Sequence, residues 1–163
     1  MNPAHEHVAV REVGLRDGLQ SIARTVPTEI KLEWLRALHA AGLPETEVGS
    51  FVPTRLLPQL ADTAALVEAA RALPALVTSV LVPNLKGAQA ALYSGADLML
   101  LPLSASQAHS LANLRKTPDG VVAEIARIRE LRDASGSRCV LEGAPLHGHI
   151  WRARLPKTMK VAA

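Results

Sequence analysis

The chain has 163 residues, of which 48% are hydrophobic and only 2% are aromatic. This length predicts one domain with a buried core. The aliphatic composition is typical of buried parallel strands covered by Ala/Leu-rich helices. No apolar run approaches the roughly 20 residues of a membrane span, so we expect no membrane association. The N-terminus lacks the basic and apolar regions of a signal peptide, and the single cysteine, Cys139, is typical of a reducing compartment. We therefore predict a cytoplasmic protein.

The formal net charge of +3 is concentrated at the C-terminal end of the chain. Residues 144–163 contain four basic residues and no acidic one, which leaves 14 basic against 15 acidic residues in residues 1–143. A basic surface on the body of the protein is therefore not expected, and we predict no nucleic-acid partner.

Short apolar runs alternate with longer helical patterns about every 30 residues, which is typical of parallel strands joined by helices. Thr28 is the predicted N-cap of the first helix, and Gly42 its predicted end. The predicted apolar faces are Ile30, Leu32, Leu35 and Leu38 in the first helix, and Val121, Val122, Ile125, Ile128 and Leu131 in the last. In chain order we predict a strand at 8–14, a helix at 28–41, a strand at 45–51, a helix at 60–73, a strand at 77–83, a helix at 86–94, a strand at 96–104, a helix at 118–133 and a strand at 138–143.

Two α/β architectures have this pattern: an open doubly wound sheet and a TIM (β/α)₈ barrel. Polar residues collect where the predicted strands end, which is where function lies in both folds. No G-x-G-x-x-G follows a predicted strand, so a dinucleotide-binding fold is disfavoured and a barrel is favoured. A complete barrel needs about 250 residues, so we predict five β/α units of one over residues 1–143. Residues 144–163 have no clear pattern and are interpreted as a divergent basic tail.

Four motifs at predicted strand ends carry a family resemblance. They are "VREVGLRDGLQ", "EVGSFVP", "LVPNLKG" and "LPLSAS", and in this order they resemble the hydroxymethylglutaryl-CoA lyases, which are metal-dependent TIM-barrel enzymes. The resemblance covers about residues 8–143. Related Claisen-condensing synthases look similar but typically have Glu where this chain has Leu19, so the lyases are favoured.

The resemblance implies a retro-Claisen cleavage of hydroxymethylglutaryl-CoA into acetyl-CoA and acetoacetate, with Mg²⁺ or Mn²⁺ as cofactor. Asp17 matches the family's first metal ligand, and Arg16 matches its catalytic arginine, which stabilises the developing enolate oxygen. Glu47 matches an acidic residue that supports the site beside this arginine; the alternative is a carboxylate that pairs with Arg16 for packing only.

Five further residues are candidate contacts to an acyl-CoA substrate. Asn84 and Lys86 stand at a predicted helix start, where backbone N–H groups and a cation suit CoA phosphates. The alternative for this pair is a helix cap and a solvated lysine. The remaining candidates are Gln20 of the first motif and two strand-end hydroxyls, Ser50 and Ser104, whose alternative interpretation is that of ordinary turn residues.

The chain also departs from the family pattern. The family's H-x-H pair, its asparagine ligand and its late cysteine would all fall beyond residue 163. His147 and His149 mimic the pair but follow the fifth strand too closely to stand on a seventh. Cys139 lies within a predicted strand and is interpreted as a small core residue. We therefore expect impaired activity, keep a non-catalytic remnant and a related synthase as alternatives, and expect the open sheet edges to favour a second copy of the chain.

Overall fold

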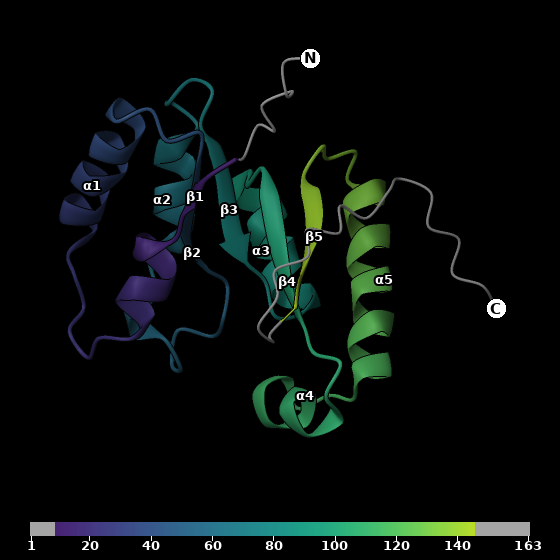
Figure 1. Ribbon diagram of the computed structural model, residues 1–163. Coiled ribbons are helices and arrows are strands. Elements are labelled where there is room, and N and C mark those ends of the chain that lie inside the picture. The colour runs from purple at the N-terminus through teal and green to yellow at the C-terminus, as the bar shows by residue number, and fades with distance from the viewer. Residues whose placement is uncertain (1–8, 146–163) are drawn as a thin grey trace, which may run out of the picture.

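The computed structural model describes residues 9–145, in which strands and helices alternate (Figure 1). The predicted alternation is confirmed, although β1 is shorter than expected. The elements are β1 (Arg11–Glu12), the π-helical turn η1 (Gly14–Gly18), α1 (Thr28–Ala40), β2 (Glu45–Ser50), the 3₁₀ turn η2 (Pro58–Leu60), α2 (Thr63–Ala70), β3 (Val77–Leu81), α3 (Leu85–Ser94), β4 (Leu98–Leu103), α4 (Gln107–Leu114), α5 (Pro118–Ala134) and β5 (Val140–Pro145).

The five strands form one parallel sheet in the order β1-β2-β3-β4-β5, so each strand pairs with its sequence neighbour. The helices follow the same order, because α1 contacts α2, α2 contacts α3, and α3 contacts α5. This is the arrangement of consecutive units in a TIM barrel, with an inner sheet and an outer layer of helices. The predicted fold is confirmed for these five units.

The two faces of the sheet differ in chemistry. The outer face contributes Val48, Val80 and Leu101 to an aliphatic core shared with the helices. Glu47 and Ser79 are register partners in neighbouring strands, so they share the inner face, where they are 1% and 0% exposed. The aliphatic core therefore lies between the sheet and the helices, whereas charged and polar side chains lie on the inner face of the sheet.

Several local predictions were wrong. Thr28 is the first residue of helix α1, so the N-cap is Pro27 and not Thr28 as predicted. The Thr28 hydroxyl instead donates a 2.8 Å hydrogen bond to Asp62 Oδ2, so a tertiary contact replaces the local cap. Helix α4 was not predicted, because Leu111 and Leu114 are the only large apolar residues in its sequence. Val122 is 48% exposed, so it lies outside the buried face of α5.

Other helix boundaries follow the sequence closely. Gly42 has φ +82°, and its N–H donates to the His39 carbonyl, which ends α1 as predicted. Thr117 caps α5 through the N–H of Gly120, with Pro118 in the first turn. Within residues 9–145, no helix is long and apolar enough to cross a membrane.

Candidate active site

Arg16 and Asp17 lie in the η1 turn, immediately after β1. The backbone N–H groups of both residues donate to the Val13 carbonyl, at 3.1 and 2.7 Å, so the chain winds tightly as the strand ends. Gly14 begins this turn with its N–H 2.7 Å from Glu12 Oε1. A Cβ at position 14 would stand 2.8 Å from the same oxygen, so the end of the Glu12 side chain would have to shift. The turn therefore holds both functional candidates at the carboxyl edge of the sheet.

Arg16 makes a bidentate ion pair with Glu47, the third residue of β2. Arg16 Nε lies 2.6 Å from Glu47 Oε1, and Arg16 Nη2 lies 2.9 Å from Glu47 Oε2. The Glu47 side chain is 1% exposed, whereas that of Arg16 is 17% exposed. This fork-to-fork geometry fixes the plane of the guanidinium while leaving part of it accessible. The contact predicted between these residues is confirmed.

Burial raises the pKa of Glu47 above its ordinary value, and the hydrogen bonds and charge of Arg16 oppose this effect. A carboxyl group with a raised pKa binds its proton more tightly in the folded protein than in the unfolded chain. Stability therefore falls as the pH rises from the ordinary pKa of the group to its raised value in the folded protein. The ionised form of Glu47 thus costs the fold stability, and Arg16 reduces that cost.

Asp17 is more open than Glu47, with a side chain that is 56% exposed. It accepts hydrogen bonds from Arg16 Nη1 at 2.8 Å and from Gln20 Nε2 at 2.7 Å, and both end on Oδ1. Neither of these two hydrogen bonds uses Asp17 Oδ2, and a carboxylate oxygen of this kind is a suitable hard ligand for a divalent cation. The structure therefore brings together four of the predicted site residues: Arg16, Asp17, Gln20 and Glu47.

The described residues do not form a complete metal centre. Within residues 9–145, no group of three or more His, Cys, Asp or Glu side chains is placed to hold an ion. Asp17 fits the role of a single ligand, and Mg²⁺ requires about six oxygen positions. His147 and His149 lie outside the described residues.

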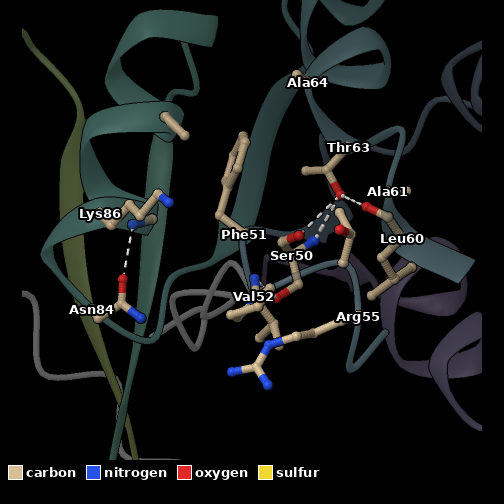
Figure 2. Close-up of a pocket in the computed structure, with 14 residues that line it drawn as sticks. Ser50, Phe51, Val52, Arg55, Leu60, Ala61, Thr63, Ala64, Asn84 and Lys86 are labelled. Carbon is tan, nitrogen blue, oxygen red and sulfur yellow. Dashed lines mark hydrogen bonds between the residues drawn. The ribbon is translucent and has the colours of Figure 1, made fainter. Parts of the chain in front are cut away.

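A pocket of about 390 Å³ lies between the loop after β2 and the start of α3 (Figure 2). Asn84 caps α3 by accepting a 2.9 Å hydrogen bond from the N–H of Gly87, and the exposed Lys86 lines the pocket beside it. Arg55, which the sequence interpretation missed, adds a second exposed cation to the lining. Two cations and a helix N-terminus around one pocket suit an anionic ligand.

The two predicted strand-end serines are both buried and hydrogen-bonded. Ser50 Oγ donates to the Leu81 carbonyl and accepts from the N–H of Val52, each at 3.2 Å, and it reaches the pocket lining. Ser104 Oγ lies 3.2 Å from His109 Nδ1, on α4, and does not line this pocket. Both hydroxyls hold the turns in which they stand, and Ser104 directly follows the carboxyl end of β4.

Cys139 is 3% exposed, as expected for a small core residue. Burial, with a contribution from the Asp97 charge, raises the pKa of its thiol to about 12. A thiol with such a pKa is protonated at neutral pH, so Cys139 has none of the features of a nucleophile.

Comparison with known proteins agrees with this geometry. The family model described as HMGL-like matches residues 7–151. The chain is 36% identical to the mitochondrial hydroxymethylglutaryl-CoA lyase of Arabidopsis thaliana, over 94% of this chain and 34% of the relative. It is 42% identical to the cytoplasmic 3-hydroxy-3-methylglutaryl-CoA lyase of Rattus norvegicus, over 67% of this chain and 32% of the relative. A Pseudomonas aeruginosa 3-hydroxy-3-isohexenylglutaryl-CoA/hydroxy-methylglutaryl-CoA lyase is 37% identical, over 88% and 49%.

Solved structures give the same result. The hydroxymethylglutaryl-CoA lyase of Pseudomonas aeruginosa superimposes with a TM-score of 0.78 at 33% identity, covering 85% of this chain and 45% of the other. An Acinetobacter baumannii lyase in complex with coenzyme A and 3-methylmalate superimposes with a TM-score of 0.73 at 33% identity, covering 84% and 44%. The chain thus spans about half, or less, of the proteins that it resembles. Its relatives are carbon–carbon lyases, and the chain belongs to the HMGL-like family of hydroxymethylglutaryl-CoA lyases.

Proposed function

We propose that this chain cleaves hydroxymethylglutaryl-CoA by a retro-Claisen reaction, at a reduced rate. In that reaction the bond between the thioester α-carbon and the hydroxyl-bearing carbon breaks. The hydroxyl group loses its proton and becomes the ketone of acetoacetate, while the electron pair forms the enolate of acetyl-CoA, which takes up a proton at carbon. The observation that carries the proposal is the bidentate Arg16–Glu47 pair at the carboxyl edge of the sheet, next to Asp17.

The role of Arg16 follows from its environment. Its guanidinium is held in one plane by the buried Glu47, its Nη1 donates to Asp17, and the side chain stays 17% exposed. A pre-oriented cation of this kind stabilises a developing enolate oxygen without having to reorganise during the reaction. Glu47 thus acts on the chemistry by positioning Arg16.

Asp17 is the proposed protein ligand for a divalent cation, Mg²⁺ or Mn²⁺. When bound, that cation would hold the hydroxyl and carboxyl oxygens of the substrate. Gln20 fixes one Asp17 oxygen and thereby orients the other.

The pocket beside α3 is the proposed site of the CoA moiety. Lys86 and the N-terminus of α3 would contact its phosphates, and Asn84 holds that helix start in place. Ser50 is proposed to line the route of the substrate from this pocket, and Ser104, directly after β4, is proposed as a second hydroxyl that contacts the substrate. An acyl-CoA ligand is supported by the coenzyme A complex of the Acinetobacter relative, and a cytoplasmic location by the cytoplasmic relative.

An assay of acetoacetate release tests the proposed reaction. With hydroxymethylglutaryl-CoA and Mg²⁺, we expect slow turnover that Arg16→Lys reduces by about a hundredfold or more, because lysine lacks the fork that Glu47 holds. Arg36→Lys, on the exposed side of α1, is the matched control and should leave the rate unchanged. If the parent chain releases no acetoacetate above the Arg16→Lys level, the non-catalytic remnant is the better description. Condensing activity with acetyl-CoA and a keto acid would instead indicate a synthase.

Metal binding gives a separate prediction. Because Asp17 supplies only one or two of about six oxygen positions, Asp17→Ala should change Mn²⁺ affinity by less than about threefold. Electron paramagnetic resonance of free Mn²⁺ measures this directly. Tight, stoichiometric Mn²⁺ binding that disappears in Asp17→Ala would contradict the prediction, and it would indicate that His147 and His149 complete the site.

A further inference from the structure

A second buried ion network lies deeper in the sheet than Arg16. Arg11, on β1, pairs through Nε with Oε1 of Glu45, its register partner on β2. Its Nη2 lies 2.9 Å from Oε2 of Glu142, on β5. The three side chains are 15%, 11% and 9% exposed, so this is an interior network and not a solvated surface pair.

This network joins the two ends of the sheet. β1 and β5, purple and yellow in Figure 1, are the first and last strands in the sheet order. In a flat sheet they would be four spacings of about 4.8 Å apart, or roughly 19 Å, with their side chains parallel. Arg11 and Glu142 meet because the sheet curves and their side chains point toward each other across its interior. The contact therefore depends on barrel-like curvature and in turn stabilises it.

The placement of Arg16 depends on the same strand. β1 has only two residues in the ladder with β2, and the η1 turn that carries Arg16 begins two residues after it. The turn is also held directly, by its contacts with β2, by the Arg16–Glu47 pair and by the buried Leu15. The charge of Arg11 also reaches Glu47, whose pKa it lowers against the effect of burial.

We propose that Arg11 is a positioning residue: its ion pairs with Glu45 and Glu142 close the curved sheet across its interior and so set where Arg16 stands relative to Glu47. Without Arg11, Glu45 and Glu142 would lose the cation that they share, and β1 would lose its side-chain contact with β5. The proposal rests on the proposed function in naming Arg16 as the catalytic residue, but the effect of the Arg11 ion network on the fold is measured without substrate.

The test compares Arg11→Met, Arg11→Lys and the milder Glu142→Gln with the control Arg36→Met, all in the full chain. Two signals are followed by nuclear magnetic resonance: hydrogen exchange of the backbone amides, and the Nε–H resonance of Arg16, which its bond to Glu47 protects. In Arg11→Met we expect the amides of Arg16 and Asp17 and the Arg16 Nε–H to exchange about tenfold faster or more, while the amides of α5 change much less. Glu142→Gln should give a smaller effect of the same pattern, and Arg11→Lys should recover part of the protection.

Unchanged protection at Arg16 and Asp17 in both Arg11→Met and Glu142→Gln would overturn the proposal. So would an equal loss of protection in η1 and α5, because that is the signature of general destabilisation. The same protection in Arg11→Lys as in Arg11→Met would also count against the proposal, since a network held by charge must respond to the retained charge. If the Arg16 Nε–H is unprotected in the parent chain, the Arg16–Glu47 pair does not form in solution. The amide signals alone then test the role of Arg11.

Discussion

Replacing Gly49 with alanine is expected to destabilise the fold by about 3 kcal/mol, near the upper end of the usual cost of overpacking. A Cβ at this position would stand 2.2 Å from Thr63 Oγ1 and 2.8 Å from Thr63 Cγ2. Thr63 has little room to move, because it is 2% exposed and its hydroxyl lies within hydrogen-bond distance of the Ser50 N–H, the Ser50 carbonyl and the Leu60 carbonyl. The clash therefore either separates α2 from β2 or breaks these buried hydrogen bonds.

Urea unfolding followed by circular dichroism measures the change. Gly18→Ala is the matched control, because a Cβ there meets nothing within 4 Å and its backbone does not require glycine. We expect the control to unfold within about 0.5 kcal/mol of the parent chain. Equal urea midpoints for the two alanine variants would contradict the close approach of Gly49 to Thr63.

Replacing Lys31 with methionine is expected to cost about 3–5 kcal/mol, the range for breaking one partner of a buried ion pair. Lys31 is 0% exposed, and its Nζ donates to Asp62 Oδ1 and to the Gln59 carbonyl, both at 2.6 Å. Methionine keeps most of the volume but leaves Asp62 with an uncompensated charge. The same contacts tie α1 to the turn that leads into α2, so the loop beside the proposed CoA pocket should loosen as well.

The measurement is again urea unfolding, with the exposed Lys86→Met as control, which should change stability by less than about 0.5 kcal/mol. A double variant, Lys31→Met with Asp62→Asn, removes the unpaired charge. We expect it to be more stable than Lys31→Met alone, with a coupling of about 1–3 kcal/mol between the two sites. A single Lys31→Met variant as stable as Lys86→Met would show that the buried pair contributes little.

The order of the elements and the centre of the site could be predicted from the sequence because both depend on local patterns. Apolar runs of strand length and longer helical stripes recur along the chain, and parallel strands bring their carboxyl ends to one edge. Arg16 and Asp17 follow the first such run, and Glu47 stands on the second. Their proximity therefore follows from the order of the parallel strands, and the Arg16–Glu47 ion pair confirms it.

What depended on contacts between distant segments could not be predicted in this way. From the sequence, Lys31 would be expected on the surface of its helix and Ile30 in the apolar stripe. In the structure Lys31 is 0% exposed and Ile30 is 36% exposed. Lys31 is buried because it binds Asp62, which lies thirty-one residues further along the chain. Arg11 and Glu142 are separated by 131 positions, and no local pattern links them. Only the curvature of the assembled sheet brings these two charges together, because side chains on opposite strands meet only when the sheet bends around a common interior.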